Sequence, residues 1–138
     1  MRQKISLKGV IIGALIDVLG SGIWGMVVGS YITIKHQLYT LPYAEQANQL
    51  QALMLHTPLV VILNVVIGGA FTIIGGYIAA RIAKHNELLN GSLASFLCVL
   101  SALAGIGSAP VIGVLIGVIV NPVLALLGGY LRLLQKAK

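Results

Sequence analysis

The sequence predicts an all-α membrane protein, in which four transmembrane helices form a tightly packed, glycine-rich bundle with a short amphipathic helix in the first extracytoplasmic loop. Of the 138 residues, 58% are hydrophobic and only 9% are charged, whereas charged residues make up about a quarter of an ordinary soluble domain. The apolar residues also form four long runs without alternation. In lipid such runs must be helical, because their backbone groups find no water to bond.

The first span is predicted over about residues 9–34, directly after a basic N-terminus. It is too long for the apolar core of a signal peptide, so we expect it to be retained. Asp17 shares one helix face with Gly9, Gly13 and Gly20. A carboxyl group is costly in hydrocarbon, and glycines let another helix come close enough to supply a partner for it. A stripe on the roughly opposite face predicts a second neighbour: Gly22, Gly25 and Gly29.

The largest segment outside the spans is expected to contain an interfacial helix over about residues 42–55. Pro42 suits its first turn, and an apolar face is predicted that includes Tyr43, Leu50 and Met54. This helix is either a connector on the membrane surface or a surface that binds a partner. Two histidines flank the segment, and their separation in sequence does not fit a metal site, while a role in pH sensing stays open: His36 and His56.

Three further spans are predicted over about residues 58–80, 91–107 and 111–131, so that residues 1–138 form a single transmembrane domain. Each span carries small residues along one helix face. The expected helix-packing positions in these spans are Gly68, Gly75, Gly113, Gly117 and Gly128. Asn90 is expected to cap the third span. The second and fourth spans both end in Gly-Gly-Tyr, which leaves an ancestral duplication of a helical hairpin open.

The positive charges predict the orientation of the chain. With the N-terminus in the cytoplasm, eight of the nine Lys and Arg residues fall on the cytoplasmic side and only Lys35 lies outside. We therefore expect a protein of the bacterial inner membrane with both termini cytoplasmic. The net charge of +6 does not indicate a nucleic-acid partner, because the basic residues lie at helix ends rather than along one face.

Four polar side chains are expected at one depth, roughly 12–17 Å from the cytoplasmic ends of their helices. This intramembrane polar layer consists of Asp17, Thr72, Cys98 and Asn121. We predict a hydrogen bond between Asp17 and Asn121, with Thr72 also within reach. Two interpretations stay open: the layer only holds helices together, or Asp17 titrates or binds a cation during transport.

Two resemblances bear on these alternatives. The segment from Gly75 to Gly91, in which Gly-Gly-Tyr-Ile-Ala-Ala-Arg is followed by a short loop and Leu-Leu-Asn-Gly, resembles a group of small uncharacterised bacterial four-helix membrane proteins, and it implies no activity. The layout of four helices with one acid midway along the first is similar to that of the small multidrug-resistance transporters. Those proteins hold lipophilic cations with aromatic residues around the acid, whereas glycine and small aliphatic residues surround Asp17.

We expect no enzyme activity, cofactor or metal site, because Asp17 has no second acid nearby and the spans hold no histidine and no phosphate-binding loop. The sequence favours a protein that acts by helix–helix contact, as an accessory subunit, assembly factor or immunity-type binder. Its expected partners are the lipid bilayer and either another membrane protein or a second copy of the chain. The alternative is a small oligomeric proton- or ion-coupled transporter that uses Asp17.

Overall fold

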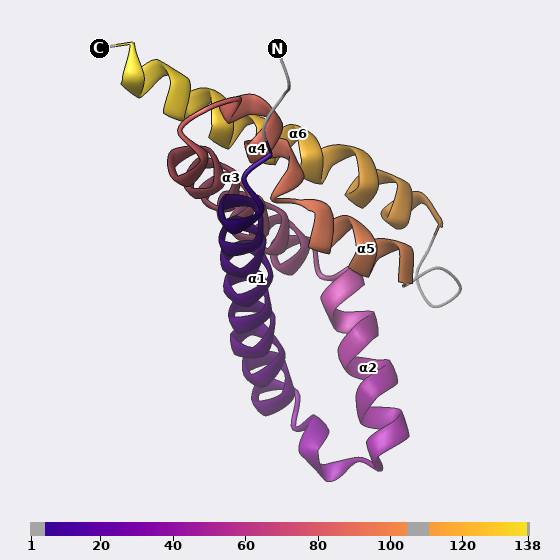
Figure 1. Ribbon diagram of the computed structural model, residues 1–138. Helices are drawn as coiled ribbons and strands as arrows, with labels where there is room; N and C mark the ends of the chain where they lie inside the picture. The colour runs from indigo at the N-terminus through magenta and orange to yellow at the C-terminus, as the bar shows by residue number, and fades with distance from the viewer. Residues whose placement is uncertain (1–4, 105–110, 138) are drawn as a thin grey trace. The chain divides into compact units, whose positions relative to one another are not determined.

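The computed structural model describes residues 5–104 and 111–137, and these residues are helical apart from short turns (Figure 1). The predicted all-α class is confirmed. The elements in chain order are α1 (Leu7–Lys35), the 3-10 turn η1 (Leu38–Thr40), α2 (Tyr43–His56), α3 (Pro58–Ala83), α4 (Glu87–Leu93), α5 (Phe96–Ala104) and α6 (Val111–Lys136).

Within the described residues, three helices are long and apolar enough to cross a membrane. They are α1, α3 and the part of α6 from Gly117 to Lys136, with 29, 26 and 20 residues. At 1.5 Å per residue their lengths are about 30 to 44 Å, against about 30 Å of hydrocarbon in a bilayer. Their outer surfaces carry large apolar side chains, such as Ile23, Val65 and Ile119, which are at least 60% exposed. Such surfaces suit lipid better than water.

The third span expected over residues 91–107 stays a prediction. The structure has two short helices there, α4 and α5, which are separated at Ala94 and Ser95. The hydroxyl groups of Ser92 and Ser95 donate to carbonyl oxygens three residues back, at 3.0 and 2.9 Å, which favours a local turn over a continuous α-helix. With nine residues, α5 is too short to cross a bilayer alone. The last three residues of the predicted span lie outside the described residues.

The chain divides into two compact units. Unit 1 comprises residues 1–19 and 69–138, and unit 2 comprises residues 20–68. The single transmembrane domain therefore stays a prediction, and each unit is described by itself below.

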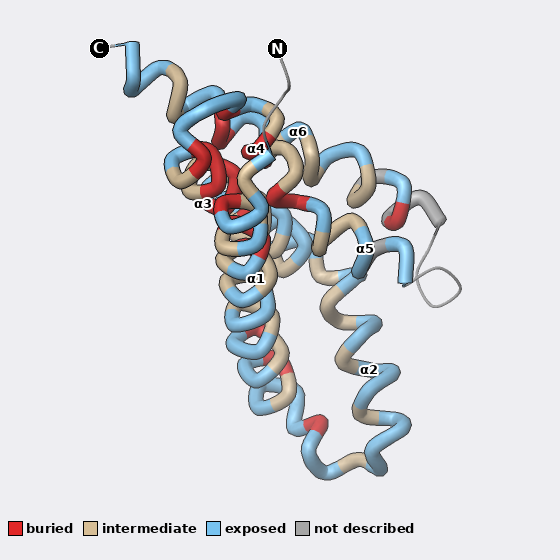
Figure 2. Tube along the Cα trace, viewed as in Figure 1, coloured by how far each residue is buried: buried red, intermediate tan, exposed pale blue. Residues whose placement is uncertain are grey.

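In unit 1 the helices pack through very small residues. Figure 2 shows buried residues gathered in the second half of α3 and in α4. Ala79, Ala80 and Ala125 have no exposed surface. The largest fully buried side chains in this unit are polar: Asp17, Asn90 and Ser95. A core of this kind brings helix backbones together and places each buried polar group close to a neighbouring helix.

In unit 2 the core is conventional and apolar. Val28, Ile32 and Leu38 are buried, and side chains from α1, α2 and α3 pack against them. The indole of Trp24 donates to the amide oxygen of Asn64 at 2.9 Å. The predicted helix over residues 42–55 is confirmed as α2. Its packed face differs from the predicted one: the side chains that contact this core are Leu50, Leu53 and Met54, whereas Tyr43 is 86% exposed.

Candidate functional site

The structure brings together three of the four side chains of the predicted intramembrane polar layer. Asp17 in α1 is 1% exposed and Thr72 in α3 is 3% exposed. The Thr72 hydroxyl donates to Oδ1 of Asp17 at 2.9 Å, and the Cys98 thiol in α5 donates to Oδ2 at 3.2 Å. Three helices of unit 1 thus meet at one carboxyl group, and both of its oxygen atoms accept hydrogen bonds from neutral side chains.

The predicted hydrogen bond between Asp17 and Asn121 stays a prediction. Thr72 and Cys98 donate to the carboxyl oxygens of Asp17, and Asn121 is half-buried in α6. Helix α3 uses adjacent faces for its two neighbours: Thr72 and Gly75 face α1, whereas Gly76 faces α6.

Four of the predicted helix-packing glycines lie where a larger residue would not fit. A Cβ atom at Gly9 would stand 2.7 Å from the carbonyl oxygen of Ala79, and one at Gly13 would stand 2.5 Å from that of Gly75. A Cβ at Gly75 would in turn lie 2.6 Å from the carbonyl oxygen of Gly13. At Gly128 it would overlap the backbone of α3. Cβ atoms essentially never come this close to backbone oxygens, so only glycine fits these positions.

Among the other predicted packing glycines, Gly68 lies in open space. A Cβ at Gly68 would meet no atom within 4 Å. Gly20 and Gly117 are half-buried, and the surroundings of Gly113 lie outside the described residues. Further close-packed glycines are Gly76 against Ala125, Gly91 against Gly129, and Gly129 against Glu87. The Gly-Gly doublets before Tyr77 and Tyr130 were the available signal, since adjacent glycines allow one helix to pack closely on two neighbouring faces.

Asn90 does not cap the third span as predicted. It lies inside α4, whose N-cap is Asn86, and it has no exposed surface. Its Oδ1 accepts the backbone N–H of Ser6 at 2.7 Å, and its Nδ2 donates to the carbonyl oxygens of His85 and Asn86 at 3.0 and 3.1 Å. Asn90 therefore fastens the start of α1 to the turn before α4.

Unit 2 contains an open groove of about 820 Å³ between α1 and α2. The floor includes Gly22 and Gly25, where an added Cβ would meet nothing within 4 Å, and Gly29, where it would lie 4.0 Å from Leu50. The wall from α2 contains two of the three predicted partner-surface residues, Leu50 and Met54. The full lining is Gly22, Gly25, Met26, Gly29, Ser30, Thr33, Ile34, Gln46, Leu50 and Met54. The glycine stripe predicted to meet a second neighbour thus faces an open groove.

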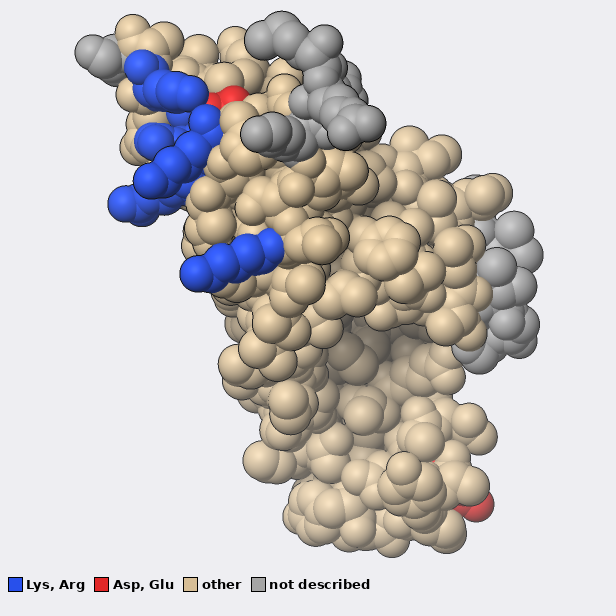
Figure 3. All heavy atoms as spheres, viewed as in Figure 1, with Lys and Arg blue, Asp and Glu red and all other residues tan. Residues whose placement is uncertain are grey.

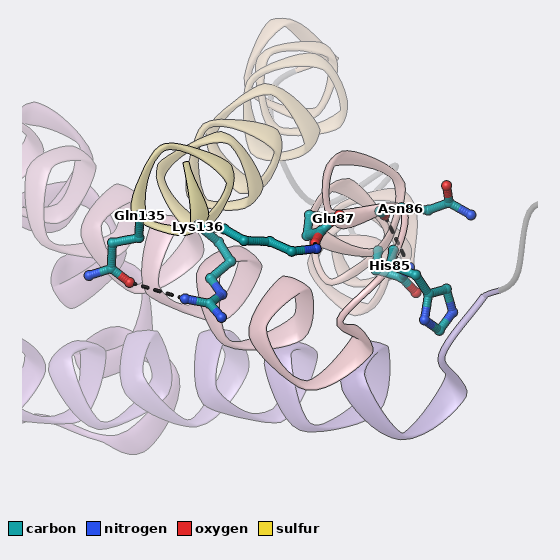
Figure 4. Close-up of polar contacts among 7 residues, drawn as sticks. His85, Asn86, Glu87, Gln135 and Lys136 are labelled. Atoms are coloured by element: carbon teal, nitrogen blue, oxygen red, sulfur yellow. Dashed lines mark hydrogen bonds and ion pairs between the residues drawn. The ribbon is translucent and has the colours of Figure 1, made fainter. Parts of the chain in front are cut away.

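Lys and Arg side chains gather at the end of unit 1 where α3 and α6 terminate (Figure 3). There Lys136 donates to the carboxylate of Glu87 at 2.9 Å, and Figure 4 shows its side chain extending from α6 to α4. Glu87 is only 7% exposed. The hydrogen bond from Lys136 lowers the pKa of Glu87 and outweighs the opposite effect of burial. The bond joins the last turn of α6 to the start of α4.

These features define a class: an all-helical protein with three helices long and apolar enough to cross a membrane, and one further short apolar helix, within the described residues. Those residues include no group of three or more His, Cys, Asp and Glu side chains that could hold a metal ion. No protein family, curated protein or solved structure was found that matches the chain.

Proposed function

We propose that this chain is a small polytopic protein of the bacterial inner membrane, with both termini cytoplasmic, that binds a transmembrane helix of another membrane protein. It would serve that protein as an accessory subunit, assembly factor or immunity-type binder. The proposal is based on the different surroundings of two sets of glycines in α1. Gly9 and Gly13 are covered by backbone at contact distance, whereas Gly22 and Gly25 open into the groove of unit 2.

The chemistry of the groove favours a protein helix as its occupant. Small residues let helix backbones approach closely in lipid, where van der Waals packing and hydrogen bonds drive association. The walls combine apolar side chains, Met26 and Met54, with hydrogen-bonding groups such as Ser30 and Gln46. A lipid acyl chain would leave those polar groups without partners, while a helix with small or polar residues on one face would bond them.

The basic residues of unit 1 support the proposed orientation of the chain in the membrane. The basic residues in the last turns of α3 and α6, Arg81 and Lys136, lie at the end of the unit that also holds Lys8. Positive charge is enriched on the cytoplasmic side of membrane proteins. A cytoplasmic location of this end is tested by labelling single cysteines placed near Lys8 and Lys136 from outside intact cells, where we expect no reaction.

Site-specific photo-crosslinking tests the helix-binding role. A photo-reactive amino acid at Met26, which lines the groove, should give an adduct with a second membrane protein. Filling the groove by Gly25→Leu should remove that adduct without loss of the folded protein, because the position is open. The same photo-reactive residue at Ile23, which is exposed but does not line the groove, serves as the control. An adduct that persists in Gly25→Leu, or one with twice the mass of the chain, contradicts the proposal, and so does the absence of any adduct.

One observation favours a second candidate, proton- or ion-coupled transport: Asp17 is a buried acid within a helix of membrane-spanning length. Against it, Thr72 and Cys98 occupy both carboxylate oxygens, and the glycine contacts around Gly13 leave little room for a cargo. Flux driven by a pH gradient can be measured with purified protein in liposomes. We expect no flux that depends on Asp17, so Asp17→Asn should not change the result. Flux that disappears in a folded Asp17→Asn variant would establish transport instead.

A further inference from the structure

A second hollow lies in unit 1, between the C-terminal parts of α3 and α6. It has a volume of about 610 Å³, and apolar side chains make up most of its walls. Its lining residues are Tyr77, Leu131, Leu134, Gln135 and Ala137. The Tyr77 hydroxyl donates to Oε1 of Gln135, so the polar groups of the hollow are held together at one place. An apolar hollow with a small polar region is the shape that an amphipathic molecule fills.

Positive charge borders this hollow. Arg132 in α6 donates to Oε1 of Gln135 at 3.4 Å, and Arg81 lies one helical turn beyond Tyr77 in α3, on the same side of the helix. Lys136 is instead engaged with Glu87, and Figure 4 shows it on the opposite side of the α6 end from Gln135. The carboxylate of Glu87 is thus bonded to Lys136. The guanidinium group of Arg132 donates to the neutral Gln135, and its positive charge also helps to lower the pKa of Glu87.

We propose that this hollow, the α3–α6 end pocket, binds an anionic phospholipid of the adjacent leaflet. The acyl and glycerol part would lie along Leu131, Leu134 and the ring of Tyr77, and the phosphate would be bound by Arg132 and Arg81. Arginine suits this role because its guanidinium group donates several parallel hydrogen bonds to a phosphate. Basic pockets between transmembrane helices on the cytoplasmic side bind anionic headgroups in this way. The inference depends on the membrane location given under the proposed function, but not on the groove of unit 2.

Lipid binding to the full-length protein in a neutral detergent tests the proposal. Native mass spectrometry would count bound short-chain phosphatidylglycerol, phosphatidylcholine with the same chains, and inorganic phosphate. We expect phosphatidylglycerol to bind at least fivefold more tightly than phosphatidylcholine, since each cation near the headgroup contributes about 1 kcal/mol, which is about a fivefold change in affinity. Phosphate alone should not bind detectably. Equal binding of the two lipids, or equal binding of free phosphate, overturns the proposal.

Matched variants distinguish a specific lipid-binding site from nonspecific electrostatic attraction of the lipid. Arg132→Gln should weaken phosphatidylglycerol binding about fivefold, and Ala137→Trp, which fills the hollow without changing charge, should weaken it as well. Lys8→Gln removes the same charge from α1, outside the lining, and should change binding less than twofold. Equal effects of Arg132→Gln and Lys8→Gln contradict the proposal. The result is independent of the helix-binding role: Gly25→Leu should keep lipid binding, and Arg132→Gln should keep the photo-crosslink at Met26.

Discussion

The backbones of Gly13 and Gly75 are in direct contact. A Cβ on either glycine would lie 2.5 to 2.6 Å from the carbonyl oxygen of the other. Asp17 lies one turn further along α1, and Thr72 lies about one turn earlier in α3, so the same close approach brings the Thr72 hydroxyl to the Asp17 carboxylate. Close glycine packing and the hydrogen bond to the buried acid are therefore two aspects of one helix–helix contact.

Gly75→Ala should destabilise the protein. The added methyl group would lie 2.6 Å from the carbonyl oxygen of Gly13 and 3.2 Å from Cβ of Asp17, so α1 and α3 would have to separate. Overpacking of this kind costs about 1–3 kcal/mol. Gly25→Ala in the open groove is the control, and it should be neutral or stabilise α1 by up to about 1 kcal/mol. Unfolding by sodium dodecyl sulfate in mixed micelles measures both, and equal effects would contradict the packing.

The hydroxyl group of Thr72 should contribute to stability through its bond to Asp17. Thr72→Val keeps the shape of the side chain and removes the donor, and we expect a loss of about 0.6–2 kcal/mol, the range for hydrogen bonds between helices in membranes. Thr72→Ser keeps the donor and should recover most of this loss. The same micelle unfolding assay compares the three proteins. A Ser variant as unstable as the Val variant would mean that packing of the methyl group, not the hydrogen bond, determines the effect.

Much of the helical architecture could be predicted from composition and periodicity. Long apolar runs predict helices in lipid, where backbone groups find no water. A single acid on a glycine stripe indicates that this face of the first helix packs closely on another helix, and in the structure Gly13 lies against α3. In the sequence, the Gly-Gly doublets before Tyr77 and Tyr130 are only a similarity between two helix ends. In the structure each of these two doublets gives its helix two closely packed faces: Gly75 and Gly76 lie against α1 and α6, and Gly128 and Gly129 lie against α3 and α4.

The remaining differences from the expected elements have physical causes that one-dimensional patterns do not contain. The break between α4 and α5 depends on the hydroxyl groups of Ser92 and Ser95, which bond to nearby carbonyl oxygens although the stretch remains apolar overall. Asn90 looked like a helix cap because asparagine favours that position. Its actual partner, the N–H of Ser6, is 84 residues away in sequence, and no local rule identifies such a contact.

Removing the Asn90 side chain should be among the most damaging polar substitutions in unit 1. Asn90→Ala removes a fully buried amide group that accepts the N–H of Ser6 and donates to two carbonyl oxygens. Loss of a buried hydrogen-bond partner costs about 1–3 kcal/mol. Asn48→Ala on the exposed surface of α2 is the control and should stay within about 0.5 kcal/mol of the parent protein. Hydrogen exchange at Ser6 and the first turn of α1 should accelerate in Asn90→Ala, and unchanged exchange there would refute the fastening role.

The ion pair of Glu87 and Lys136 should make stability depend on pH in the acid range. Because Lys136 lowers the pKa of Glu87, the folded protein binds a proton at this carboxyl group less readily than the unfolded chain does. The pair therefore contributes stability above the ordinary pKa of glutamate, and this contribution is lost as the pH falls through the lowered pKa. Lys136 is 56% exposed in its side chain, so solvent screens the interaction and we expect only about 0.2–1 kcal/mol at neutral pH.

The measurement compares the parent protein with Lys136→Met from neutral to strongly acid pH. At neutral pH the variant should be less stable by that amount, and the difference should shrink as the pH falls below the usual glutamate range, because protonated Glu87 no longer attracts Lys136. Lys8→Met, a lysine on another helix, is the control for general charge loss and should not reproduce this pH dependence. A stability difference for Lys136→Met that stays constant over the whole acid range would show that the aliphatic part of the lysine, rather than its charge, holds the end of α6 against α4.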